Sequence, residues 1–280
     1  MRFEVMAGAL AAACILGAAG GADAAVNEVD IGLNPTFQQT GPNTVVATGG
    51  FFSARAFLDS VNDFDGGTLT FPGAGSPVAL TPDQGVTLAF GDSASTMAEL
   101  NAAYPFGTYA FHLTNSSTAD TKDVSIDYST IADSPAIPAL TAASFNGLQG
   151  LNAASGFTFD FNAFTQSPDA DEGFLFLNVF DSAGNNVFSS NPDVTATSVF
   201  MAGGTLAAGQ DYTYDLIFDS RILGSDAGVD TEIFFDSHTS GAFSTAAAGV
   251  PEASTWALLL IGFGGLGAAL RQRRSRPLVS

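Results

Sequence analysis

Few residues of this chain could do chemistry as nucleophile or base. It has two histidines, His112 and His238, and one cysteine, Cys14. Asp236, Ser237 and His238 supply the residue types of a hydrolase triad, but neighbours on a strand point to alternate faces, so adjacency does not assemble one. Two carboxylates could also cleave a glycosidic bond in so acidic a chain. We therefore expect no catalytic residue, and a secreted hydrolase is the second alternative.

Three carboxylate-bearing loops could hold a metal ion, at residues 169–172, 181–185 and 226–230. Oxygen-rich turns suit Ca²⁺, which takes six to eight hard ligands. None of these loops has the spacing of an EF-hand, and Asp, Asn and Gly also favour turns for conformational reasons. We expect no cofactor, with Ca²⁺ as the open possibility and its ligands unknown.

The C-terminal residues have the physical pattern of a membrane anchor. Residues 256–270 carry no charge, with Trp256 at one end and a cluster of arginines at the other. An interfacial Trp and a basic stop flank a span of this kind, and the basic end stays in the cytoplasm. As a helix, this span is about 22 Å long, short of a ~30 Å hydrocarbon core. The arginines of the stop are Arg271, Arg273, Arg274 and Arg276.

This tail resembles the PEP-CTERM sorting signal, in the variant with Trp-Ala after the Pro-Glu motif. The matching residues are Val250, Pro251, Glu252, Trp256 and Ala257, followed by a Gly-rich span and the arginine cluster. Ala253 stands where the usual signal has a second proline. The resemblance implies recognition by an exosortase in a Gram-negative envelope, and an association with exopolysaccharide and biofilm.

The N-terminus, residues 1–24, reads as a signal peptide for the Sec translocon. Arg2 precedes an apolar stretch, and Ala22 and Ala24 frame an A-x-A cleavage site. Acylation of Cys14 is an alternative, but the residues before it make a poor lipobox. Cleavage after Ala24 removes this cysteine, which excludes disulfides from the mature fold.

Charge limits the partners of the exported body. Residues 26–250 contain 25 acidic residues against the three basic residues Arg55, Lys122 and Arg221, a net charge of −22. Such a body repels nucleic acid and anionic lipid. It suits solubility, divalent cations or a hydrated polymer matrix.

Alternating apolar residues predict an all-β body. Residues 157–161, 174–180, 212–218 and 231–235 alternate or run apolar between turn clusters, as strands do. Five further strands are expected in the first half, and one short helix within residues 95–103. Short strands at this spacing predict a β-sandwich. The first-half strands are expected at residues 45–47, 68–71, 86–90, 108–113 and 124–128.

Leu206, Gly209 and Tyr212 match the pattern L-x-x-G-x-x-Y. This pattern resembles the tyrosine corner of fibronectin type III and immunoglobulin-like sandwiches. The resemblance implies that the Tyr212 phenol bonds backbone upstream of its strand. It covers roughly residues 139–240.

The Pro-rich stretch 134–138 is the expected boundary between two small β-domains. The expected organisation is a signal peptide (1–24), an N-terminal β-domain (25–136), a fibronectin type III-like sandwich (137–249) and a sorting and anchor segment (250–280). The expected function is that of an exported, non-catalytic protein of the cell surface or extracellular matrix. The first alternative is a surface-displayed glycan-binding module, in which exposed Tyr or Phe would lie beside acidic loops.

Overall fold

The computed structural model describes residues 25–61, 63–128 and 136–247, so both the predicted signal peptide and the predicted sorting tail lie outside the described residues. Within them the chain forms thirteen strands and two short helices, which confirms the all-β prediction. The elements are β1 (Val26–Gly41), β2 (Thr44–Leu58), β3 (Gly66–Thr70), β4 (Val78–Asp83), β5 (Thr87–Ala94), α1 (Met97–Ala103), β6 (Thr108–Thr114), β7 (Thr121–Asp127), α2 (Ala142–Leu148), β8 (Phe157–Asp160), β9 (Glu172–Asp181), β10 (Asn186–Ser190), β11 (Ser198–Met201), β12 (Asp211–Asp226) and β13 (Val229–Ser244).

The strands bury alternate side chains, as the sequence predicts. In β12, Tyr212, Tyr214, Leu216 and Phe218 are buried, because side chains two residues apart share one face of a strand. The five strands expected in the first half correspond to β2, β3, β5, β6 and β7.

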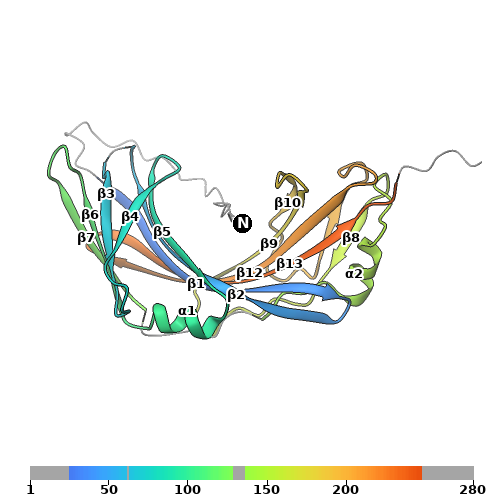
Figure 1. The fold of residues 1–280 in the computed structure, drawn as a ribbon, viewed down its shortest axis with the longest axis horizontal. Helices are drawn as coiled ribbons and strands as arrows, with labels where there is room; N and C mark the ends of the chain where they lie inside the picture. The colour runs from blue at the N-terminus through green and yellow to red at the C-terminus, as the bar shows by residue number, and fades with distance from the viewer. Residues whose placement is uncertain (1–24, 62, 129–135, 248–280) are drawn as a thin grey trace, which may run out of the picture.

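One sheet of eleven strands dominates the fold, in the order β10-β9-β12-β13-β1-β2-β5-β4-β3-β6-β7. Its centre is made of four long strands, β1, β2, β12 and β13, of 15 or 16 residues each. In Figure 1 these strands run from one end of the molecule to the other. β1 lies parallel to β13 and antiparallel to β2.

At each end a second β-layer covers the long strands. At one end β4 turns the sheet back, because Val78–Leu80 pair with β3 and Thr81–Asp83 pair with β5. The Tyr128 ring, next to β7, then stacks on Phe235 of β13, with centroids 6.1 Å apart. At the other end β8 and β11 form a two-stranded sheet, and Phe161 packs against Phe218 of β12 at 6.3 Å. Face-to-face β-layers around an aromatic core confirm the predicted sandwich.

The two ends have separate hydrophobic cores. The first core is made of buried apolar residues from the range 26–128, together with Val229, Ile233 and Phe235 of β13. The second contains residues 140–218 together with Phe243, also from β13. Along the chain, residues before the predicted boundary at 136/137 pack in the first core and those after it pack mainly in the second. The strand β13 contributes to both cores, and the large sheet extends through both ends. Whether the two halves are separate domains stays a prediction.

A buried glutamine joins the two halves. Gln39 of β1 donates from Nε2 to the Leu140 carbonyl at 2.9 Å, and its Oε1 accepts from the Leu140 N–H at 2.9 Å. The Tyr214 hydroxyl also donates to this oxygen, at 2.8 Å. The Gln39 side chain thus pairs with the Leu140 backbone as a neighbouring strand would. Leu140, which follows the predicted boundary, also forms an isolated β-bridge with Phe161.

Both helices are single short segments with hydroxyl caps. At α1, which lies within the predicted range, Thr96 accepts from the Glu99 N–H at 3.2 Å. The helix α2 was not predicted; it begins after Thr141, which accepts from the Ser144 N–H at 3.2 Å. No helix within the described parts of the chain is long and apolar enough to cross a membrane. The predicted span at 256–270 lies outside those parts.

Candidate functional site

All of the predicted sorting and cleavage residues lie outside the described residues. They comprise the sorting motif, the basic stop and the signal cleavage site, namely Val250, Pro251, Glu252, Trp256, Ala257, Arg271, Arg273, Arg274, Arg276, Ala22 and Ala24. Their roles stay predictions, and the described body is where side-chain geometry can be read.

The corner residues lie together at the start of β12. The Tyr212 hydroxyl accepts from the Ala207 N–H at 2.8 Å and lies 3.5 Å from the Ala207 carbonyl. Gly209 adopts a positive φ of 68°, a conformation in which a glycine is favoured. Leu206 is buried beneath the turn.

We predict that Tyr212→Phe lowers the free energy of unfolding by about 1–3 kcal/mol, because the Ala207 N–H loses the hydroxyl of the buried Tyr212 as its acceptor. The denaturant midpoint of residues 25–249 measures the change, and Tyr214→Phe serves as a comparison that removes a different phenol. An unchanged midpoint for Tyr212→Phe would show that the corner bond does not stabilise the fold.

The predicted acidic loops use their carboxylates within the protein. Asp181 accepts from the Ala183 and Asn185 N–H groups at 2.9 Å each, as in a turn. Asp171 accepts from the Leu223 N–H at 2.9 Å, and Asp226 from the Ser125 N–H at 2.7 Å. One carboxylate of each loop therefore binds backbone N–H groups of the protein, and Ca²⁺ binding by these loops stays a prediction.

A row of charged side chains crosses the central strands on one face, which we call the ion-pair face. Asp30 of β1 lies opposite Arg55 of β2 and Glu232 of β13. The Arg55 guanidinium donates to Asp30 from Nε at 3.0 and 2.9 Å and from a terminal nitrogen at 2.5 Å. Its Cζ also lies over the Phe57 and Phe234 rings, 5.3 and 5.1 Å from their centroids.

Arg221 of β12 extends the ion-pair face to the neighbouring strand. It donates to Asp219 from Nε at 2.6 Å and lies 3.2 Å from a Glu232 oxygen. Its Cζ lies 4.5 Å from the centroid of the Phe174 ring. Arg55 and Arg221 are two of the three basic residues of the acidic body, and both form ion pairs on this face.

A histidine and three aspartates complete the ion-pair face. His238 lies 3.4 Å from Asp215 and 3.6 Å from Asp236. Asp236 and Asp219 are opposite each other in the β12–β13 ladder. Among the described residues, Oδ1 of each has no hydrogen-bond partner. Ser237 lies buried between Asp236 and His238 in the sequence, and alternation turns it to the other face.

Burial is the largest influence on the pKa values of the titratable groups on this face. It raises the pKa of Glu232 to about 7 against the opposing charge of Arg221. Burial and the nearby Asp236 carboxylate raise the pKa of Asp219 well above its usual value. Burial works against the charged form of His238, but Asp215 and Asp236 raise its pKa to about 10. The carboxyl groups of the face are shifted in different directions: burial raises the pKa values of Glu232 and Asp219, whereas for Asp236 the hydrogen bond and positive charge of His238 outweigh burial and lower its pKa.

Three carboxylates of the face lie close enough to share a cation. Oxygens of Glu28, Asp30 and Glu232 are within 4.8 Å of one another. The guanidinium of Arg55 already occupies both Asp30 oxygens. Burial also raises the pKa of all three groups. The arrangement is therefore that of an internal ion-pair network.

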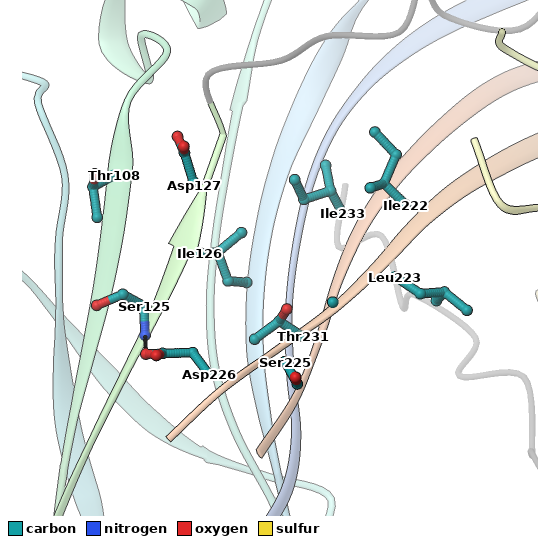
Figure 2. Close-up of a pocket in the computed structure, with 11 residues that line it drawn as sticks. Thr108, Ser125, Ile126, Asp127, Ile222, Leu223, Ser225, Asp226, Thr231 and Ile233 are labelled. Atoms are coloured by element: carbon teal, nitrogen blue, oxygen red, sulfur yellow. Dashed lines mark hydrogen bonds between the residues drawn. The ribbon is translucent and has the colours of Figure 1, made fainter. Parts of the chain in front are cut away.

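A cavity of about 390 Å³ lies elsewhere, between β7 and the end of the β12–β13 hairpin. Figure 2 shows Ile126, Ile222 and Ile233 around it, with the Ser125 N–H bonded to Asp226 at its narrow end. Asp219, Asp236 and His238 do not line it. Asp219 and Asp236, the facing carboxyl pair of the ion-pair face, therefore lie away from this cavity.

Sequence reasoning missed the ion-pair face. Asp30 and Arg55 meet only because β1 and β2 pair in one register, and Asp219 meets Asp236 through the β12–β13 register. The available signal was charge on one face of an otherwise apolar strand, as at Glu232 and Asp236, which lie four residues apart. In a half-buried strand such charges demand partners.

Aromatic exposure bears on the glycan-binding alternative. All five tyrosines of the chain are buried. Phe106 and Phe200, exposed by 51% and 66%, lie on different elements, before β6 and in β11. No row of exposed rings is present in the described body, so this alternative lacks a stacking surface there.

Comparisons with known proteins place a sorting signal at the C-terminus. Residues 249–274 match the family model of the PEP-CTERM protein-sorting motif, which confirms the predicted resemblance of the tail. The motif implies export, and a membrane-anchored tail before processing by an exosortase. No curated protein matches the chain.

Solved structures give only distant likenesses. A two-domain fibronectin type III segment of chicken tenascin has 15% identity and a TM-score of 0.25, over 75% of this chain and 99% of that one. The BSP domain of a biofilm associated protein has 14% identity and a TM-score of 0.20, over 82% of this chain and 30% of that one. The FN1–FN3 domains of chicken CNTN1 have 6% identity and a TM-score of 0.23, over 82% and 69%.

Proposed function

We propose that the chain is a non-catalytic protein of the cell surface or extracellular matrix, associated with exopolysaccharide. Its tail holds it in the inner membrane until an exosortase acts near Pro251 and Glu252, after Sec-dependent export. The match of residues 249–274 to the sorting motif carries this proposal.

Charge supports the matrix part of the proposal. The exported body has a net charge of −22, while four arginines follow the predicted span. Such a body stays soluble and remains apart from anionic lipid once it is released. The ion-pair face supports the non-catalytic part, because its carboxyl groups are engaged with arginine and histidine inside the fold.

Processing of the C-terminus tests the proposal. We expect Pro251→Ala combined with Glu252→Ala to leave full-length protein in the inner membrane, because the exosortase loses its recognition motif. Mass spectrometry of the C-terminus after membrane fractionation measures this. A matched control changes one Pro-Asp pair of the body, Pro192→Ala with Asp193→Ala, and should be processed normally.

If the tail variant is trimmed and released like the wild type, a plain membrane anchor replaces the sorting interpretation. A separate experiment tests the association with the polysaccharide. In cells that make no exopolysaccharide, the processed chain should leave the cell surface for the medium. Unchanged retention there would separate the protein from that polymer.

A further inference from the structure

Two aspartates of the ion-pair face lie opposite each other in the middle of the sheet. Asp219 of β12 pairs with Asp236 of β13 in the antiparallel ladder, midway along two strands of 16 residues each. The Cβ atoms of directly opposite residues are about 5 Å apart, and like charges in such a pair are destabilising. The Asp219 side chain is only 1% exposed, so water screens little of that repulsion. The fold therefore favours a state in which one of the two carboxyl groups is neutral.

The hydrogen bonds of the two carboxyl groups point to the same state. Oδ2 of Asp219 accepts from Arg221 Nε at 2.6 Å, and Oδ2 of Asp236 lies 3.6 Å from His238 Nε2. Oδ1 of each aspartate is buried and has no hydrogen-bond partner among the described residues. Two ionised carboxylates can only accept, whereas a protonated carboxyl group donates one hydrogen bond. A single proton on the pair supplies the donor that two carboxylates lack.

The charges around the pair balance when it holds one proton. Arg221 and His238 are the cations in contact with it, and Asp215 lies 3.4 Å from His238. With Asp219 neutral, these two cations face two carboxylates, those of Asp215 and Asp236. An ionised Asp219 would add an unbalanced negative charge beside Asp236. The other charged groups on this face are Glu232 on β13, Glu28 and Asp30 on β1, Arg55 on β2 and Glu172 on β9.

The pair lies where the two hydrophobic cores meet. Phe218, which precedes Asp219, belongs to the second core, whereas Phe235, which precedes Asp236, belongs to the first. Alternation places the aspartates on the opposite face of the same two strands. The long strands continue through this junction from one half to the other (Figure 1). A change of charge on the pair therefore acts where the two halves are joined.

We propose that Asp219 and Asp236 hold a single proton between them, carried by Asp219, and that this proton makes the junction of the two halves sensitive to pH. Arg221 and His238 keep Asp236 ionised. Loss of the proton at alkaline pH places two buried negative charges on one rung of the β12–β13 ladder and weakens the contact between these strands.

The direction of the pH response follows from the two carboxyl groups. Burial, the Asp236 charge and a hydrogen bond to Asp236 raise the pKa of Asp219 well above its usual value. For Asp236, His238 and the hydrogen bond from Asp219 outweigh burial and lower the pKa. The folded chain thus keeps a proton that the unfolded chain releases at about pH 4. The stability that this proton contributes is complete below about pH 4 and is lost as the pH rises through the raised pKa of Asp219.

Asp219→Asn tests the proton in the exported chain purified from the producing cells. Asparagine keeps a donor for Asp236 and an acceptor for Arg221, as a protonated carboxyl group does. We expect its unfolding equilibrium constant in urea to lie within about threefold of the wild type at about pH 5. Towards about pH 9 the wild type should lose at least about tenfold more stability than the variant, because one proton is worth about tenfold per pH unit. Glu232 and His238 titrate in both proteins, so the difference isolates Asp219.

Asp236→Asn is the matched change on the same rung of the ladder. It removes a carboxylate that faces His238, so we expect it to raise the unfolding equilibrium constant at least about tenfold at neutral pH and to lower the pKa of His238 from about 10. Asp230→Asn, at an exposed position of β13, controls for the loss of one negative charge and should keep the pH dependence of the wild type.

Infrared spectroscopy in D₂O detects the proton directly. At about pH 6 the wild type should show a C=O band of a neutral carboxylic acid that Asp219→Asn removes and Asp230→Asn keeps. If Asp219→Asn fails to fold, a ¹³C titration of the wild type decides, because the assigned carboxyl carbon of Asp219 should keep its protonated shift at the same pH.

Three results would each overturn the proposal. The first is an Asp219 carboxyl group that is ionised at about pH 6 by infrared or ¹³C measurement. The second is an equal pH dependence of the urea midpoint for the wild type and Asp219→Asn. The third is an equal loss of stability for Asp219→Asn and Asp236→Asn, which would mean that Asp219 does not carry the proton.

Discussion

Replacing Arg55 with methionine should lower the free energy of unfolding by about 3–5 kcal/mol, because it leaves a buried carboxylate without its counter-charge. Asp30 has a side-chain exposure of 2%, and Arg55 makes three hydrogen bonds to it. The Arg55 side chain also covers Phe57 and Phe234. Methionine keeps much of that apolar contact, so the loss measures mainly the ion pair.

A double-mutant cycle separates charge from packing. Asp30→Asn in the Arg55→Met background should recover about half of the loss or more, because replacement of both charges removes the unpaired one. Lys122→Met removes a positive charge at a more exposed position, and should cost less than about 1 kcal/mol. Urea unfolding of residues 25–249 at neutral pH measures the wild type, Arg55→Met, Asp30→Asn, the double variant and Lys122→Met. If the double variant is as unstable as Arg55→Met alone, an unpaired Asp30 charge is not the cause.

Replacing Gln39 with leucine should be comparably severe, at about 3–5 kcal/mol. Gln39 is buried and makes three hydrogen bonds, two to the Leu140 backbone and one from Tyr214. Leucine has a similar volume but leaves all three partner groups unsatisfied inside the protein, at roughly 1–3 kcal/mol each before relaxation.

The adjacent Gln38 is the matched control for this change. It is exposed on the same strand, so Gln38→Leu should change stability by less than about 0.5 kcal/mol. Tyr214→Phe removes one of the three bonds and should cost about 1 kcal/mol. Equal urea midpoints for the Gln39 and Gln38 variants would contradict the role of Gln39 as the buried link between the halves.

The strands could be read from the sequence because their signal is local. Residues 212–218 alternate between apolar and polar, and the structure buries Tyr212, Tyr214, Leu216 and Phe218 within β12. The first long strand escaped prediction. Pro35 lies in the middle of β1, and proline normally argues against a central strand.

The structure accommodates Pro35 by a local change of partners. The register between β1 and β13 is interrupted after Gly32 and resumes at Thr36. Within the interruption, the Asp236 N–H donates to the Asn34 side chain at 2.8 Å instead of to backbone. A side-chain acceptor next to a proline could not be inferred without the register of two strands about 200 residues apart.

The ion-pair face was unpredictable for the same reason. Arg221, Asp219 and Glu232 are close in sequence, but their contact depends on the β12–β13 hairpin. Asp30 and Arg55 come from strands whose pairing no local pattern specifies. The sorting tail is the opposite case, because its motif is contiguous and needs no tertiary structure to be recognised.

The position of β13 decides how the body would resist a mechanical load. A pull on the chain beyond Thr245 enters the body along β13, the strand that ends at Ser244. This strand is hydrogen-bonded to β12 from Val229 to Ser244 and to β1 on its other side. Tension along it must therefore shear two ladders at once, whereas an edge strand such as β10 would peel away one bond after another. The fold thus places a strand that is paired on both sides next to the residues that lead to the predicted sorting tail.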